Sequence, residues 1–308
     1  MKDIKNSITK NSKIVSSFIE NIQVINYIPK DQMKEDNEIK TILGIGGTHI
    51  YYGKVKNTKI IRENILPLPK VETFFKDIID YGVKLSYFDK NTLKINCIFS
   101  YPFKSIEKDN FIDGFFEKLD YSGKKIPFED TNFFVSEKLK QYINWKINFN
   151  ILNDSVSTNL FNINKYRDYD MHISVISGTG VNVSFTKGIK IINSEIGRAR
   201  ILKDEITGKF VPIESMTSFN NICRLSKKYN IDKEILKERS AGIIASIVIG
   251  ITNNTKNIKN VAIIAQGSFI TKDEKYFQNL NILLSKYLKK DFIFYKDNKA
   301  DIKGASLL

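Results

Sequence analysis

Two short turns rich in glycine and threonine lie at matching places in the two halves of this 308-residue chain. The first turn, GGT at 46–48, separates two apolar runs within 42–55, and a third strand-like run follows at 57–64. The second turn, GTG at 178–180, is flanked in the same way by three short runs within 171–193. Three strands with a tight turn between the first two, present twice, predict a duplicated α/β fold with two lobes around a central cleft.

Apolar periodicity predicts further helices and strands around these turns. Within 70–88 the apolar residues recur every three or four positions, which is typical of a helix that faces a core. We expect further helices at 13–28, 236–252 and 274–288, and buried strands at 92–102, 261–265 and 291–295.

The composition is that of a soluble globular protein, with 42% hydrophobic and 27% charged residues. The longest apolar stretch, 241–251, is too short to cross a bilayer, and the basic N-terminus lacks the apolar segment of a secretory signal. The two cysteines, Cys97 and Cys223, both lie in apolar segments, so no disulfide framework is expected. These features predict a cytoplasmic protein without a membrane partner.

The net charge of +14 favours anionic partners. Nucleic acid is not expected, because the lysines are spread along the chain, whereas a nucleic-acid footprint concentrates on one face. Small polyanions such as nucleotides fit the same positive field. The two histidines, His49 and His172, are far apart in sequence, which argues against a histidine-based metal site.

Both glycine turns are candidates for phosphate binding, because glycine lets the backbone approach a ligand and threonine adds a hydroxyl. The alternative for each is an ordinary hairpin turn. Two such turns in matching places favour the view that they hold one polyphosphate from both sides. Gly267-Ser268, after the strand at 261–265, suits either a nucleoside or a tight turn.

Three carboxylates are candidates for chemistry. Asp154 follows an apolar strand, where it serves either as the N-cap of the next helix or as a general base facing a hydroxyl. Glu195 lies between an apolar strand and a glycine, and Glu214 lies within PIESMTS (212–218). The alternative for both glutamates is an exposed surface carboxylate.

Taken in order, these pieces resemble the hexokinases, which are sugar kinases of the actin-like ATPase (ribonuclease H-like) fold. The likeness covers nearly the whole chain, and it rests on the collinear order of its motifs. The motifs are GIGGTHIYYG (44–53), IFSYPF (98–103), LNDSVST (152–158), SGTGVNVSF (177–185), INSEIG (192–197), KERSAGIIAS (237–246), AQGSF (265–269) and IKGASLL (302–308). The resemblance implies a small lobe of 41–153 and a large lobe of 1–40 and 154–308.

The resemblance also assigns roles to residues. Asp154 would take the proton from the sugar hydroxyl that attacks the γ-phosphate of ATP. Sugar contacts would come from Ser100, Asn153, Asn182, Glu195 and Glu214, with Lys124, Ser122 or Lys125 in place of the family's Thr-Lys contact. Nucleotide contacts would come from Gly46, Gly47, Thr48, Gly178, Thr179, Gly180, Gly267 and Ser268.

The chain departs from the family pattern in its first turn. The family has an aspartate that helps to hold magnesium where this chain has Gly44, and an arginine where it has Tyr51. With that aspartate absent, Asp154 is the candidate for holding Mg²⁺ through water. The segments PIESMTS and EIG are also similar to sugar kinases and repressors of the ROK type, but the zinc-binding cysteines of that group are absent and Arg198 replaces its histidine.

The expected function is therefore ATP- and Mg²⁺-dependent phosphorylation of a glucose-like hexose to the 6-phosphate, a step of glycolysis and carbohydrate metabolism. The main alternative, favoured by Gly44 and Tyr51, is a weak or silent relative that binds sugar as a sensor. A basic DNA-binding regulator is a third alternative, and no helix-turn-helix segment supports it. The preferred hexose and the oligomeric state are left open.

Overall fold

The computed structural model describes residues 2–20, 37–108, 111–117, 126–129 and 131–308. Contacts divide the chain into two compact units. The first-turn unit holds Ile25–Lys165, Ile189–Ile191 and Lys299–Leu308. The second-turn unit holds Met1–Val24, Tyr166–Gly188 and Ile192–Asn298. Residues 154–165 and 299–308 thus group with the first turn, although the predicted large lobe contained them. The lobe boundaries stay a prediction.

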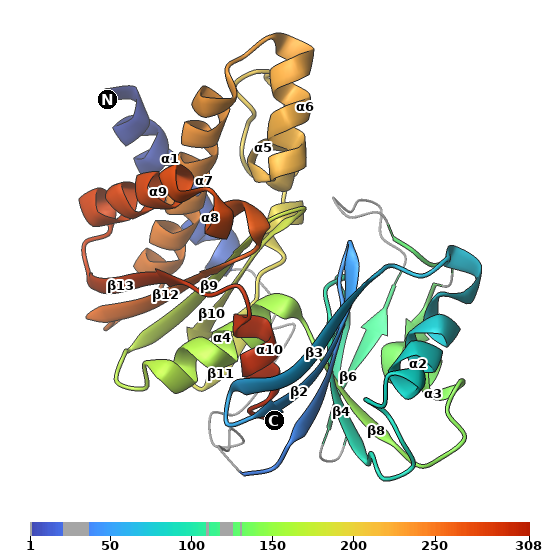
Figure 1. Cartoon of the computed structure of the whole chain (residues 1–308). Helices are drawn as coiled ribbons and strands as arrows, with labels where there is room; N and C mark the ends of the chain where they lie inside the picture. Colours follow the sequence, from blue (N-terminus) through green and yellow to red (C-terminus); the bar gives the residue numbers. More distant parts are fainter. Residues whose placement is uncertain (1, 21–36, 109–110, 118–125, 130) are drawn as a thin grey trace. The chain divides into compact units, whose positions relative to one another are not determined.

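The first-turn unit is built on a five-stranded sheet in the order β3-β2-β1-β4-β8 (Figure 1). Strand β1 pairs antiparallel with β2 and parallel with β4, and β4 pairs parallel with β8. The strands are β1 (Lys40–Ile45), β2 (His49–Lys56), β3 (Lys59–Pro67), β4 (Lys94–Phe99) and β8 (Asn148–Leu152).

Neighbouring residues along each strand enter opposite cores, because strand side chains alternate between the two faces. Leu43 belongs to a core with helices α2 (Phe74–Lys84) and α3 (Val135–Lys140). Ile42 belongs to a second core with helices α4 (Asp154–Lys165) and α10 (Ala300–Ala305). The sheet is therefore covered on both faces, which explains its near-continuous apolar strands.

The second-turn unit repeats this strand order as β11-β10-β9-β12-β13. Its core cluster combines the sheet with helices α1 (Lys2–Glu20), α7 (Lys233–Asn254) and α9 (Glu274–Tyr287), which lie on one face in Figure 1. The strands are β9 (Met171–Ser177), β10 (Val181–Lys187), β11 (Lys190–Asn193), β12 (Asn260–Gln266) and β13 (Asp291–Lys296). The identical order of strands confirms the predicted duplicated α/β fold.

Most of the predicted elements are confirmed. The helix expected at 13–28 begins at Lys2, and its predicted end lies outside the described residues. A small sheet, β5-β6-β7, was not predicted. The remaining elements are β5 (Lys104–Lys108), β6 (Phe111–Phe116), β7 (Phe133–Phe134), η2 (Val71–Thr73), η3 (Ile196–Arg198), α5 (Glu214–Thr217), α6 (Phe219–Tyr229) and α8 (Ser268–Lys272).

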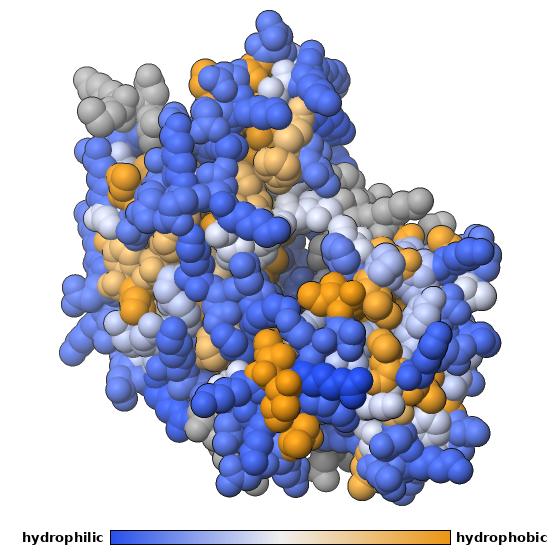
Figure 2. Space-filling model, in the orientation of Figure 1, coloured by the Kyte–Doolittle hydropathy of each residue, from blue (hydrophilic) through white to orange (hydrophobic). Residues whose placement is uncertain are grey.

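Hydrophilic side chains cover most of the face shown in Figure 2, and apolar residues are exposed only in small separate groups there. Among the described residues, none of the helices combines the length and the apolar character needed to span a bilayer. Both thiols are unpaired, with Cys97 buried and Cys223 partly buried.

Candidate functional site

Three groups of predicted site residues directly follow strands that end at the same edge of the first-turn sheet. Strands β1, β4 and β8 run parallel, and their last residues are in register, with Ile45 beside Phe99 and Ile98 beside Leu152. The residues that follow these strands are the turn 46–48, Ser100 and Asn153–Asp154. The carboxyl ends of parallel strands are where ligands bind in open α/β sheets. The strand order therefore brings the predicted phosphate turn, sugar contact and base to one edge.

The first glycine turn is a tight hairpin between β1 and β2. The N–H of Gly46 donates to His49 O at 3.1 Å, so it is used within the hairpin. The N–H groups of Gly47 and Thr48 make no hydrogen bond to a described residue, so they are available for the predicted phosphate contact. Phosphate binding by Gly46 itself would have to use other atoms.

The predicted sugar loop is fastened directly to this turn. The N–H of Ser100 donates to Ile45 O at 3.0 Å, and the hydroxyl of Tyr101 donates to Gly46 O at 3.0 Å. Burial raises the pKa of Tyr101, so the phenol remains a neutral donor. Tyr101 was not predicted as a site residue, because its role depends on a partner 55 positions away in sequence.

Capping of helix α4 falls mainly to Asn153, which is buried. Its side-chain oxygen accepts from the N–H of Ser155 at 3.0 Å and from the hydroxyl of Ser155 at 2.8 Å. Asp154 is the first helical residue, is partly exposed, and also accepts from the N–H of Ser155, at 2.8 Å. Asp154 thus contributes to the cap as the alternative predicted, and its side chain is partly exposed.

In the second-turn unit the two predicted nucleotide turns lie side by side. A Cβ on Gly178 would be 3.6 Å from the backbone nitrogen of Ser268. Gly267 has a φ of 105°, and a Cβ there would lie 2.4 Å from Ser177 O, so only glycine fits. Parallel pairing of β9 with β12 places both turns at the same sheet edge, as in the first-turn unit.

Three polar side chains of the second-turn unit form one hydrogen-bonded cluster. The amide of Asn182 donates to Asn193 at 2.8 Å and to Glu195 at 3.3 Å, and Asn193 donates to Glu195 at 2.7 Å. Glu195 has a φ of 45°, an uncommon backbone conformation for a residue with a side chain. The structure thus brings together two predicted sugar contacts, and it adds Asn193, which we had not predicted.

Glu214 packs against Gly197. It is 5% exposed, and a Cβ on Gly197, two residues after Glu195, would lie 3.6 Å from the Cβ of Glu214. A Cβ on Gly197 would also come 1.9 Å from Val181 O, so glycine is required there. The alternative of an exposed surface carboxylate is wrong for Glu214, which is buried, and for Glu195, which is partly buried.

Gly44 and Tyr51, where the chain departs from the family pattern, are opposite each other on the neighbouring strands β1 and β2. Gly44 and Tyr51 are paired in the β1–β2 register, and a Cβ on Gly44 would lie 3.0 Å from the Cβ of Tyr51. Such Cβ atoms are usually about 4.5–5.5 Å apart. A side chain at position 44 would therefore require Tyr51 to shift by a few tenths of an ångström.

The Tyr51 side chain lies on the face covered by α10. A Cβ on Gly53 would be 2.6 Å from its ring, and the Lys299 ammonium is 4.9 Å from the ring centroid. Its buried hydroxyl approaches Glu63 but makes no well-formed hydrogen bond to a described residue. Burial, more than the Glu63 carboxylate, raises the pKa of Tyr51. Lys299, 2.8 Å from Glu63, holds the pKa of that carboxyl below its usual value.

The residues present do not fit a metal at the first turn. Gly44 supplies no carboxylate, and no group of three or more His, Cys, Asp or Glu residues arranged for a metal ion occurs in the described part of the chain.

Arg198 occupies the position of the ROK histidine, and its Nε is buried without a hydrogen-bond partner among the described residues. The predicted sugar contact Lys124, with Ser122 and Lys125, lies outside the described residues.

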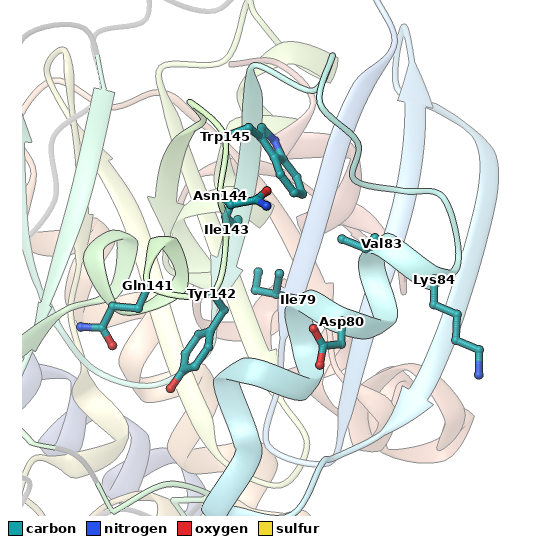
Figure 3. Close-up of a pocket in the computed structure, with 9 residues that line it drawn as sticks. All are labelled: Ile79, Asp80, Val83, Lys84, Gln141, Tyr142, Ile143, Asn144 and Trp145. Carbon is teal, nitrogen blue, oxygen red and sulfur yellow. The ribbon is translucent and has the colours of Figure 1, made fainter.

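A cavity of about 570 Å³ lies elsewhere in the first-turn unit, between α2 and the segment after α3 (Figure 3). It contains none of the predicted site residues. Its lining residues are Ile79, Asp80, Val83, Lys84, Gln141, Tyr142, Ile143, Asn144 and Trp145. Because this hollow is open to solvent and lacks the residues at the strand ends, we place the candidate site at the strand ends instead.

No family model matches the chain, and no curated protein matches it. Solved structures share its fold at low sequence identity. A glucose complex of hexokinase from Schistosoma mansoni is 15% identical over 99% of this chain and 97% of that chain, with a TM-score of 0.68. A ROK family glucokinase from Streptomyces griseus, in complex with glucose and AMPPNP, is 15% identical over 87% and 98% of the two chains, with a TM-score of 0.58.

A ROK family transcriptional regulator, a homologue of the E. coli MLC protein, has the same fold. It is 9% identical over 89% of this chain and 78% of that chain, with a TM-score of 0.59. The fold of this protein is thus that of the hexokinases and ROK proteins, as the sequence motifs predicted. The same fold occurs in sugar kinases and in a regulator.

Proposed function

We propose that this protein transfers the γ-phosphate of ATP to a glucose-like hexose, forming the 6-phosphate. The observation that carries the proposal is the meeting of the first glycine turn, Ser100 and Asn153–Asp154 at one edge of one sheet. The second-turn unit supports it with paired nucleotide turns and a cluster of amides and carboxylates. Proteins with this fold include a hexokinase and a glucokinase bound to glucose.

In the proposed reaction Asp154 accepts the proton of the sugar hydroxyl while the hydroxyl oxygen attacks the γ-phosphorus. The bond from that phosphorus to the leaving oxygen breaks, and ADP departs. Asn193 and Asn182 fix the Glu195 carboxylate, and this leaves it oriented to accept hydrogen bonds from sugar hydroxyls. Phosphoryl transfer needs positioning more than covalent chemistry, so orientation of this kind is the main contribution of the residues.

ATP is the donor that we assign to the glycine turns, because Gly178 and Gly267-Ser268 of the second-turn unit lie against each other. Magnesium lacks its usual first-turn carboxylate here. Asp154 remains the one predicted residue for holding the ion through water. Cytoplasmic localisation and a role in glycolysis stay predictions of the sequence.

A second candidate function is a sugar-binding regulator without turnover. Gly44 and Tyr51 favour it, because position 44 lacks the aspartate expected to help hold the metal, and Tyr51 lies close against that position. The regulator that shares this fold shows that the architecture also serves control proteins. The two candidates share the sugar contacts and differ in whether Asp154 supports catalysis.

The decisive experiment compares wild type with Asp154→Asn in a coupled assay with glucose and Mg-ATP. Asparagine keeps an oxygen that can accept from the Ser155 N–H, so the start of α4 is preserved, but it cannot take a proton. We expect turnover to fall about 10²- to 10⁴-fold, the usual contribution of a general base. Glucose binding, measured by calorimetry, should remain.

Equal turnover of wild type and Asp154→Asn would contradict the kinase proposal. If neither protein shows turnover but both bind glucose, the regulator is the better account. An exposed aspartate in the same unit provides the control: Asp80→Asn makes the same chemical change away from the strand ends and should leave turnover unchanged.

A further inference from the structure

Phe219 is an exposed aromatic residue fixed beside the second glycine turn. It begins helix α6 and is 42% exposed. Its N–H donates to Gly178 O at 3.3 Å, so the position of its backbone is tied to the turn. Gly178 in turn lies against Ser268 of the other predicted nucleotide turn. Phe219 therefore stands at the place where both turns meet.

Its ring is supported from the inside by other aromatic rings. The centroid lies 5.3 Å from that of Phe269, the residue after Ser268, and Phe269 stacks on Tyr276 at 4.2 Å. Phe269 and Tyr276 are buried, and Tyr276 is hydrogen-bonded to Ser240 at 2.8 Å. The rings of Tyr276, Phe269 and Phe219 thus form a series from the core to the surface. The Phe219 ring, the outermost, packs on Phe269 on its inner side and is partly exposed on its outer side.

We propose that Phe219 is the stacking platform for the nucleobase of the phosphoryl donor. This inference rests on the proposed function, because it takes the two turns to hold the donor's phosphates. Single exposed apolar residues are common and need no explanation by themselves. This one differs because its backbone is bonded to a predicted phosphate turn and its ring is backed by a residue of the neighbouring turn.

Recognition of the base by stacking affects which nucleotides can serve as phosphoryl donor. Every nucleobase has an aromatic face, so a platform of this kind binds bases without reading their edges. Selection of one base over another needs donors and acceptors aimed at its edge. The nearby amide of Asn221 is occupied, since it donates to Glu214 O at 3.0 Å and to Ser218 at 2.8 Å. We infer that adenine and guanine nucleotides bind with similar affinity.

The test measures binding of AMPPNP, its guanine counterpart and inorganic tripolyphosphate by calorimetry. Phe219→Ala should weaken AMPPNP binding about 5- to 150-fold, which corresponds to the usual strength of base–aromatic stacking. Phe219→Tyr should restore it. Tripolyphosphate, which has no base, should bind wild type and Phe219→Ala equally. Phe210→Ala is the matched control, because Phe210 is 60% exposed in the same unit and should leave all three affinities unchanged.

Two results would overturn the inference while leaving the proposed function intact. One is binding of AMPPNP by wild type and Phe219→Ala with the same affinity. The other, which would overturn the expected tolerance, is a guanine analogue that binds wild type more than about 30-fold more weakly than AMPPNP. If wild type binds neither AMPPNP nor tripolyphosphate, the proposed function and this inference are both wrong.

Discussion

At the scale of single residues, Gly44 and Tyr51 form one coupled change rather than two independent losses. Gly44 is buried, and its missing Cβ would press on the Cβ of Tyr51 at 3.0 Å. An aspartate there would combine that contact with burial of a charge. The side chain of Tyr51 already occupies the face between the sheet and α10. We therefore expect that restoring the family's aspartate is tolerated better with a change at position 51 as well.

We predict that Gly44→Asp alone lowers the free energy of unfolding by several kcal/mol, because it buries an unpaired carboxylate in crowded space. Gly44→Ala, which adds only the Cβ, should cost about 1–3 kcal/mol. Adding Tyr51→Arg to Gly44→Asp should recover stability, since the guanidinium can pair with the carboxylate. Denaturant unfolding of wild type, Gly44→Asp, Tyr51→Arg and the double variant forms a double-mutant cycle that measures the coupling. Additive effects would show that the two positions are independent.

At the scale of elements, helices α4 and α10 depend on a single glycine for their close packing. A Cβ on Gly304 would lie 1.7 Å from Ser157 O and 3.1 Å from the nitrogen of Phe161. The hydroxyl of Ser157 donates to Asp301 O, which fixes the two helices further. Asp154 lies one turn before Ser157, so this contact also helps to position the proposed base.

Gly304→Ala should therefore destabilise the protein by about 3 kcal/mol or more, as expected when a close helix contact is overpacked. Turnover should fall with it, because α4 carries Asp154. The control is Gly242→Ala in helix α7, where a Cβ would meet nothing within 4 Å. That change should stabilise the protein by about 0.5–1 kcal/mol, since alanine favours helix more than glycine does. Thermal unfolding of both variants gives the comparison, and similar effects would contradict this account.

The sequence predicted elements well where apolar patterns are local. The run 171–177 coincides with strand β9, because a strand buried on both faces is a continuous apolar segment bounded by polar residues and glycine. The sequence pattern predicts the start of helix α1 too late, because among the side chains described for residues 5–12 only Ile8 and Ser12 are buried, between lysines and other polar residues. Periodicity is weak when one face holds so few apolar side chains.

The candidate site was predictable only in part, for a similar reason. Motif order suggested Asp154 and Glu195, and the structure adds the strand ends and hydrogen bonds around them. Asn193 was missed although its partner Glu195 lies only two residues further along the chain. Tyr101 and Phe219 were missed, because each depends on a contact with a residue distant in sequence. No local pattern encodes such contacts.

At the scale of the whole molecule, the predicted sugar contacts are divided between the two units. Ser100 and Asn153 belong to the first-turn unit, whereas Asn182, Glu195 and Glu214 belong to the second-turn unit. The proposed reaction requires both sets to act on the same hexose, since the base and the carboxylate cluster come from different units. Sugar binding should consequently depend on residues of each unit.

We therefore predict that Ser100→Ala and Glu195→Gln each weaken glucose binding. The expected losses are about 0.5–1.5 kcal/mol for the neutral hydroxyl and about 1.5–3 kcal/mol for the charged group. Glutamine keeps an oxygen that can accept from Asn182 and Asn193, so the cluster should survive the change. Glu205→Gln makes the same substitution at an exposed site of the same unit and should have no effect.

Thermal unfolding with and without glucose measures this dependence for the whole protein. At a hundred times its Kd, glucose should stabilise wild type by about 2.7 kcal/mol, and both variants should show a smaller stabilisation at the same concentration. If Ser100→Ala keeps the full stabilisation by glucose while Glu195→Gln shows none, the second-turn unit binds the sugar alone. A hexose held by one unit would not reach Asp154 through the contacts proposed above, and the phosphotransfer function would then have to be abandoned in favour of sugar sensing.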